Sequence, residues 1–216
     1  MSSSWGARKR KRMEDAAEEG GGEEEAAVAA APHTTVYALG NHVYFNDDVS
    51  QQSMFLLARE LRLAARRIRM RAIESGDSSP PQPLYLHVST YGGDISAAFS
   101  VVDTLKHLGV AVYSVVEGYV ASAGTLITLA AQRRFIQANA YMMVHQLSSG
   151  MWGKMSSLAE EMHNLKKLQD HITNFYLEHT RMRAKQLKRL LLRDVNFNAQ
   201  ESIARGIADE VYLPHC

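Results

Sequence analysis

A serine stands where a strand-like apolar run gives way to a helix-like one. Ser122 follows the β-branched stretch 110–116 and precedes the apolar stretch 125–131. This pattern predicts a buried strand and then a buried helix, with Ser122 at or near the helix N-terminus. The free amides and positive dipole end of a helix stabilise a developing oxyanion there. The serine is therefore interpreted either as a nucleophile or as an ordinary N-cap, a position that serine favours.

An imidazole and a carboxylate complete the groups that serine hydrolysis requires. His145 ends the predicted strand 141–145, and Asp194 comes two residues after the predicted helix 184–192. In such chemistry an imidazole moves the proton of the hydroxyl, and a carboxylate fixes the imidazole tautomer. Spacing in the sequence does not show that the three groups meet, and a single histidine or aspartate at such a position is usually structural or solvated.

Two adjacent glycines, Gly92 and Gly93, occupy another predicted strand-to-helix turn. They let the backbone approach a ligand closely, and their amides are able to donate to a tetrahedral oxyanion. A tight turn that needs positive φ accounts for them equally well.

Several familiar sites are missing from the sequence. Val120 stands where the Gly-x-Ser-x-Gly elbow has its first glycine, and there is no dinucleotide-binding or Walker-type loop. The three histidines of the long predicted helix are too widely spaced for a zinc motif. We therefore expect no cofactor and no metal.

The elements that must position these residues alternate between strands and helices. Strands are predicted over 36–39, 42–45, 84–89, 110–116, 134–137, 141–145 and 211–213, and helices over 51–73, 94–108, 125–131, 158–179 and 184–192. We expect 134–137 and 141–145 to pair with each other, and Ser157 with Glu160 to form a capping box. The arginines of 51–73 are interpreted as a solvated helix face or a subunit-interface stripe. The alternation indicates an α/β fold with helices covering a largely parallel sheet.

Composition divides the chain of 216 residues into a tail and one folded domain. The hydrophobic content of 46% is enough for a sizeable core, and the net charge of +1 argues against a dedicated nucleic-acid binder. Residues 1–33, basic at 8–12 and then acidic and Gly-rich, are predicted to be a disordered low-complexity tail, with residues 34–216 as the domain.

Cellular location is inferred from the same features. Cys216 is the only cysteine, which excludes disulfides within the chain and favours a reducing compartment. There is no secretory signal and no apolar run of membrane-spanning length. We expect a cytoplasmic protein, or a nuclear one if the Arg8 to Arg12 cluster is a localisation signal.

Four motifs together resemble the Clp protease proteolytic subunit family, ClpP. They are LYLHVSTYGG ending at Gly93, GYVASAG around Ser122, YMMVHQ ending at Gln146, and the stretch from Arg193-Asp194 to GIAD at 206–209. They occur in the order and approximate spacing of that family, and the resemblance covers about 36–213. It implies a crotonase-like α/β fold of stacked β-β-α units with a protruding long handle helix.

The resemblance implies a serine endopeptidase that hydrolyses peptides or unfolded proteins inside an oligomeric chamber. Ser122 is expected to be the nucleophile, His145 the general base and Asp194 its orienter. The other expected site residues are Gly93 and Ala123, whose backbone amides would form the oxyanion hole, and Tyr91, Gly92 and Gln146, which would contact substrate.

The implied partners are further copies of the chain, stacked as two seven-membered rings through the long helix, whose apolar stripe also fits ordinary core packing. The family's N-terminal pore segment has no counterpart here, which argues against docking of an AAA+ unfoldase. Tyr91, Ala123 and Leu147 replace a usual proline, methionine and proline, without removing a catalytic group. The alternative functions are a non-catalytic ClpP-like ring or scaffold subunit and, less favoured, an acyl-CoA enzyme of the same fold superfamily.

Overall fold

The computed structural model describes residues 35–76 and 79–213. The predicted tail at 1–33, including the Arg8 to Arg12 cluster, and Cys216 lie outside the described residues. Within the described ranges, no helix is both long enough and apolar enough to cross a membrane.

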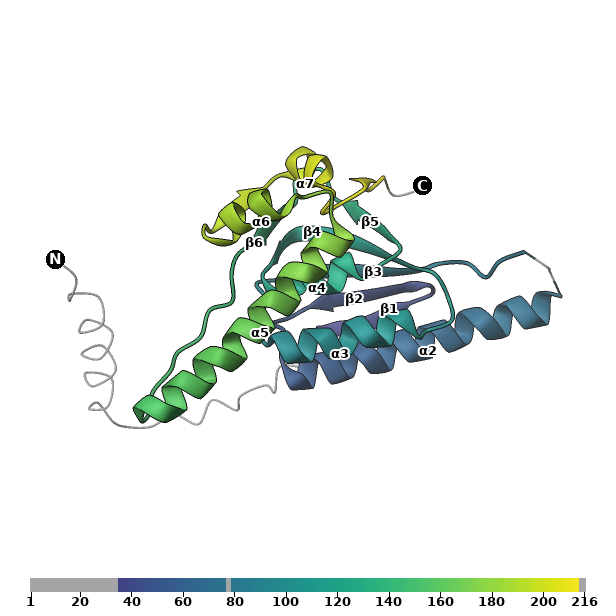
Figure 1. The fold of residues 1–216 in the computed structure, drawn as a ribbon. Coiled ribbons are helices and arrows are strands. Elements are labelled where there is room, and N and C mark those ends of the chain that lie inside the picture. Colours follow the sequence, from purple (N-terminus) through teal and green to yellow (C-terminus); the bar gives the residue numbers. More distant parts are fainter. Residues whose placement is uncertain (1–34, 77–78, 214–216) are drawn as a thin grey trace, which may run out of the picture. The chain divides into compact units, whose positions relative to one another are not determined.

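The described residues form one mixed sheet and the helices that cover it (Figure 1). The strands are β1 (Val36–Leu39), β2 (His42–Asn46), β3 (Leu84–Thr90), β4 (Val112–Ala121), β5 (Arg133–Ile136), β6 (Tyr141–Val144), β7 (Val195–Phe197) and β8 (Glu210–Val211). The helices are α2 (Gln51–Ser75), α3 (Ile95–Lys106), α4 (Ala123–Leu129), α5 (Met155–His179), α6 (Ala184–Leu191) and α7 (Ala199–Arg205). The α/β class expected from the sequence is confirmed.

The sheet runs in the order β1-β2-β3-β4-β5-β8, and its central pairs β2–β3, β3–β4 and β4–β5 are parallel. Helices α2, α3 and α4 form one layer against it, with α3 in contact with both of the others. Strand β2 shows how the sequence specifies this packing: Val43 and Phe45 are buried, whereas His42 and Tyr44 between them are only partly buried. Successive side chains of a strand point to opposite faces, so the alternation turns the apolar face toward the core.

Strand β4 has two neighbours in series along the same edge. Its first part pairs in parallel with β5, from Tyr113↔Arg133 onward, and its last part pairs in parallel with β6, from Tyr119↔Tyr141 onward. The expected pairing of 134–137 with 141–145 is therefore wrong, since both stretches are partners of β4. A ten-residue strand is long enough to serve both, and Gly118, with φ 58°, lies between the two paired parts.

Several element ends also differ from the sequence prediction. Strand β4 continues to Ala121, and α5 begins at Met155 after Lys154, which makes no side-chain cap. The capping box expected at Ser157 is therefore wrong, because this residue lies inside the first turn. Strand β7 and helix α7 were not predicted, although Asn198 and Glu201 form a capping box at the start of α7.

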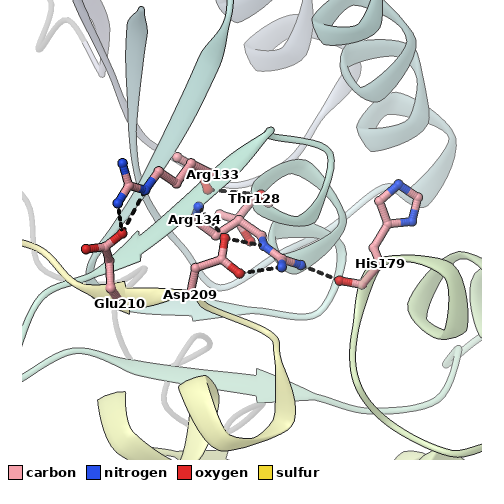
Figure 2. Close-up of polar contacts among 7 residues, drawn as sticks. Thr128, Arg133, Arg134, His179, Asp209 and Glu210 are labelled. Atoms are coloured by element: carbon pink, nitrogen blue, oxygen red, sulfur yellow. Dashed lines mark hydrogen bonds and ion pairs between the residues drawn. The ribbon is translucent and has the colours of Figure 1, made fainter.

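The C-terminal strand is held to the sheet by two ion pairs (Figure 2). Arg133 pairs with Glu210, and Arg134 pairs with Asp209 at an N–O distance of 2.6 Å. Arg134 also donates to the backbone carbonyl of His179 at the end of α5. This one arginine thus joins β5, the start of β8 and the C-terminus of α5.

Candidate active site

Ser122 lies between the end of β4 and the start of α4 in an unusual backbone conformation. Its φ of 53° and ψ of −126° make it the only non-glycine residue with positive φ in the described ranges. It occupies the N-cap position of α4, yet its side chain makes no capping hydrogen bond. A capping role thus does not account for this serine, and its hydroxyl is left for other interactions.

Backbone hydrogen bonds on both sides fix this conformation. The Ser122 amide donates to the carbonyl of Met143 on β6 at 3.0 Å. The Ser122 carbonyl accepts from the amide of Thr125 at 3.0 Å and from the hydroxyl of Thr125 at 2.6 Å. A residue held in such a sparsely populated region costs about 1–3 kcal/mol, so the surrounding structure must enforce it.

A tyrosine from α5 completes this support. The Tyr176 hydroxyl lies 2.5 Å from the Thr125 hydroxyl oxygen. The Thr125 hydroxyl donates its only proton to the Ser122 carbonyl, so the Tyr176 hydroxyl is the donor in this contact. Complete burial raises the pKa of Tyr176 to about 12, so the phenol stays protonated at neutral pH. Helix α5 is thereby tied to the turn that carries Ser122.

A pocket of about 230 Å³ opens beside Ser122. Of the residues expected at the site, Ser122, His145, Gly93, Ala123 and Gln146 line this pocket. Tyr91, Gly92 and Asp194 do not line it. The strand ends and helix starts named by the sequence pattern therefore meet at one place, with three of the eight expected residues at its margin.

His145 directly follows β6, and strand register brings Asp194 beside it. Strands β6 and β7 are antiparallel with Val144 opposite Val195, so the next pair outward is His145 and Asp194. The distance from His145 Nδ1 to Asp194 Oδ1 is 3.8 Å, and the Asp194 side chain is 81% exposed. This separation is short enough for an ion pair but exceeds the length of a hydrogen bond.

The chain after His145 is anchored by two further helices. The Gln146 amide donates to the carbonyl of Leu191 at 2.8 Å, and the Leu147 amide donates to the side-chain oxygen of Gln169 at 2.7 Å. These bonds attach the wall of the pocket to α6 and α5. The histidine is thus positioned by strand β6 on one side and by helix contacts on the other.

The glycine pair is required by close backbone approach. Val49 donates to the Gly92 carbonyl and accepts from the Asp94 amide, both at 2.8 Å, so the amide of Gly93 between them points away from Val49. A Cβ on Gly93 would lie 2.2 Å from the Val49 carbonyl oxygen, and one on Gly92 would lie 2.6 Å from Ser122 Cβ. Both residues also have positive φ, 98° for Gly92 and 143° for Gly93. The turn therefore presses directly against Ser122.

Two backbone amides are left over in this region. Gly93 N–H has no backbone acceptor among the described residues, and Ala123 is the first residue of α4, whose amide has no partner within the helix. Both residues line the pocket with Ser122. The pocket therefore combines a hydroxyl, an imidazole and unpaired amide donors.

Two polar residues of this region were missed by the sequence interpretation. The Tyr119 hydroxyl donates to Asn196 Oδ1 at 2.9 Å and links β4 to β7, while its ring lies 5.3 Å from that of Tyr91. Burial raises the pKa of Tyr119, and the nearby Tyr91 and Asp194 add to the rise. Tyr91 itself is 78% exposed. Strand alternation was the available signal, since it sets Tyr119 on the face opposite Val120.

No cluster of three or more histidine, cysteine or acidic residues suited to a metal ion occurs in the described part of the chain.

The chain is similar in sequence to one family model and to curated proteins whose names agree with it. The model of the family described as Clp protease matches residues 51–215. A protein of Treponema denticola named ATP-dependent Clp protease proteolytic subunit 2 is 29% identical over 175 residues, which cover 77% of this chain and 88% of the relative. The ATP-dependent Clp protease proteolytic subunit of Streptococcus suis is 31% identical over 136 residues, covering 61% of this chain and 69% of the relative.

Proposed function

Because this chain belongs to the Clp protease family, we propose that it is a ClpP-type serine endopeptidase that hydrolyses peptides or unfolded proteins. One observation carries this proposal. Ser122 is held in a strained conformation with its hydroxyl uncommitted, in the same pocket as His145. Enforced strain of this kind is concentrated at functional sites.

The proposed reaction uses the groups in the order that their chemistry requires. His145 accepts the proton of Ser122 Oγ as the oxygen attacks the peptide carbonyl, and then passes that proton to the leaving amine. Asp194 orients the imidazole through Nδ1 and stabilises its charged form. The present 3.8 Å separation shortens to a hydrogen bond when substrate is bound, as catalytic contacts commonly do.

The negative charge that forms on the carbonyl oxygen needs donors that are already in place. We assign this role to the backbone amides of Gly93 and Ala123, since preorganised amides cost no rearrangement during the reaction. Tyr91, Gly92 and Gln146 are proposed to contact the substrate chain. Water then hydrolyses the acyl-enzyme, with His145 again acting as base.

Assembly into a chamber is proposed from the surface of α5. The helix has 25 residues, but its buried residues are Ile172, Phe175 and Tyr176, all near its C-terminal end. Upstream, Met155 is 82% and Met162 is 43% exposed. An apolar stripe of this kind is expected to pack on copies of the same helix, in stacked heptameric rings. Peptide hydrolysis would then require no cofactor, and ATP only if an unfoldase docks.

A cellular location is proposed together with this function. We place the enzyme in the cytoplasm, with the nucleus as the alternative if the Arg8 to Arg12 cluster directs import.

The direct test is the hydrolysis of a fluorogenic peptide by Ser122→Ala. We expect turnover to fall by at least about 10³-fold, since triad knockouts retain only oxyanion and binding contributions. Ser100→Ala, an exposed serine of α3, is the matched control and should hydrolyse like wild type. Equal turnover by Ser122→Ala and wild type would overturn the proposal.

A second candidate function, a non-catalytic ring or scaffold subunit, is favoured by one observation. Asp194 is 81% exposed and forms no hydrogen bond with His145. This alternative predicts normal assembly and no peptidase activity in either wild type or Ser122→Ala. Measurement of assembly and turnover on the same preparations separates the two functions.

A further inference from the structure

A second and larger groove lies along α6, away from Ser122. It measures about 870 Å³ and is lined by α6, the chain that leads to β7, and the end of α7. Its apolar residues are Leu190, Leu192, Val195 and Phe197. Its cationic residues are Arg183, Lys185, Arg189, Arg193 and Arg205, and no acidic residue lines it.

These five cations lack a carboxylate partner in the part of the chain that the structure describes. None of them takes part in an ion pair within residues 35–76 and 79–213. The arginines of β5 differ in this respect, because Arg133 and Arg134 each face a carboxylate (Figure 2). Five like charges around one groove repel one another and create a positive potential that attracts an anionic partner.

Arg205 shows how the groove presents its donors. Its guanidinium carbon lies 4.3 Å from the centre of the Phe197 ring, and Nη1 donates to the Glu201 carbonyl at 3.0 Å. Its Nε is buried, yet it has no hydrogen-bond partner in the described part of the chain. Stacking and one backbone bond hold the planar group while most of its N–H donors remain unused.

The chemistry of the groove favours an acidic peptide. Arginine binds carboxylates through paired hydrogen bonds, and the apolar floor suits small side chains between them. A single-stranded nucleic acid would need exposed rings for base stacking, but the only lining aromatic residue, Phe197, is buried under Arg205. The volume is within the range of sites that hold a ligand of several residues.

The sequence itself contains such a peptide. Residues 14–25 carry seven carboxylates and no basic residue, interrupted only by alanine and glycine. We propose that the α6 groove binds the acidic segment 14–25 of a second copy of this chain. The groove is then an interaction surface between copies, and this inference is independent of catalysis at Ser122.

A second copy is favoured over the same copy by reach. The described chain starts beside β1 at one edge of the sheet, and β7 under the groove is five strand positions away, or roughly 24 Å. Residues 26–35 span at most about 35 Å when fully extended, and the straight line of roughly 24 Å runs through the intervening strands β2, β3, β4 and β6, which leaves little length for a route over the surface. A segment from a neighbouring copy is not tied to strand β1 of the copy that carries the groove.

The test is a carbodiimide cross-link between two distinguishable full-length copies expressed together. One copy keeps its groove but has every acidic residue of 14–25 changed to its amide. The other keeps its acidic segment but carries Lys185→Gln and Arg189→Gln. An amide bond between Lys185 and a glutamate of 14–25 then arises only between copies.

We expect mass spectrometry to find this cross-link in the mixed pair and in wild type, and salt at 0.5 M to suppress it. A cross-link in wild type but not in the mixed pair would assign the segment to its own copy and overturn the proposal. Failure to find it in either sample would also overturn it.

Binding of the isolated segment provides a second measurement. A labelled peptide of residues 13–27 is titrated into the full-length variant with the amidated segment. Adding Lys185→Gln and Arg189→Gln should weaken binding about fivefold, as expected for the loss of two exposed ion pairs. Arg66→Gln with Arg67→Gln on α2 removes the same charge and should leave binding unchanged. Equal loss in both variants, or stronger binding of a single-stranded oligonucleotide, would contradict the proposal.

Discussion

The position of Ser122 depends on close packing against Gly92 as well as on the hydrogen bonds of its own backbone. Gly92 contacts the serine so closely that a Cβ there would lie 2.6 Å from Ser122 Cβ and 2.8 Å from the Ala121 carbonyl oxygen. Because the backbone atoms around Ser122 are already fixed by hydrogen bonds, a new methyl group has no flexible side chain to displace. The position of the hydroxyl is therefore set from two chain segments.

Gly92→Ala is predicted to impair both folding and hydrolysis. We expect a loss of about 1–3 kcal/mol in unfolding free energy from positive φ and overpacking, and a fall in peptidase turnover through displacement of Ser122. Gly40→Ala is the control, since Gly40 also has positive φ but no atom within 4 Å of its added Cβ. Urea unfolding and peptide turnover should separate the two variants. Equal turnover in both would contradict this account of the site.

Residue types predicted where Ser122 lies in the chain's secondary structure, but not the contacts around it. The change from strand to helix periodicity placed Ser122 correctly at the junction, because burial dictates both patterns. The uncommitted hydroxyl and the Tyr176 to Thr125 contact were not predictable, since they depend on the packing of α5, whose Tyr176 follows Thr125 by 51 residues. The pairing of strand β7 with β6 brings Asp194 beside His145. This strand has only three residues, too few to show the alternation of buried and exposed side chains that would have predicted it.

At the scale of elements, Arg134 and Asp209 join β5 to β8 (Figure 2). Burial by itself would raise the pKa of Asp209, but hydrogen bonds and charge from Arg134 outweigh it and hold the pKa below its ordinary value of 3.8. A depressed pKa in the folded state means that the ionised carboxylate stabilises the fold. This contribution is present above the ordinary pKa and is lost as pH falls through the folded-state pKa.

Asp209→Asn is therefore predicted to destabilise the protein in a pH-dependent way. At pH 7 we expect a loss of about 1–3 kcal/mol in unfolding free energy, with the difference from wild type narrowing below about pH 4. Glu210→Gln, whose pair with Arg133 is about half exposed, should cost less than about 1 kcal/mol. Chemical denaturation across pH measures both variants. A difference from wild type that does not narrow as the pH falls below about 4 would refute the electrostatic explanation.

The elements that the sequence mispredicted have definite physical causes. Alternation along 134–137 and 141–145 reveals strands but not their partners, and both pair with β4. Helix α7 has only seven residues, too few for a clear apolar stripe, but its Asn198 and Glu201 capping box was a usable signal. The expected box at Ser157 was wrong because exposed helix ends need no side-chain cap when water satisfies them.

At the scale of the whole molecule, the upstream part of α5 stands out because it contributes no buried residue to the core of the domain. Assembly cannot be predicted from periodicity, since a stripe at three-to-four spacing fits either a core or a partner helix. The distribution of burial distinguishes the two along α5. Its buried residues lie near its C-terminal end, and the exposed Met155 and Met162 lie in its N-terminal half.

Replacing Met155, Leu158 and Met162 together with serine is predicted to dissolve the assembly without unfolding the domain. Light scattering on a size-exclusion column should show a lower mass, while far-UV circular dichroism stays unchanged, because Met155 and Met162 are exposed and none of the three side chains belongs to the buried core. Glu161→Ser with Asn164→Ser on the same helix is the control and should assemble normally. An unchanged mass in the methionine and leucine variant would exclude this stripe as an interface.

The measurement that addresses the nucleophile most directly is active-site labelling of the assembled protein with a fluorophosphonate. Such a probe forms a covalent adduct with an activated serine, and peptide mass spectrometry locates it. We expect one adduct, on Ser122, that is absent from Ser122→Ala and strongly reduced in His145→Ala. Assembled wild-type protein that takes up no probe, or that is labelled equally well after Ser122→Ala, would contradict the assignment of Ser122 as the nucleophile.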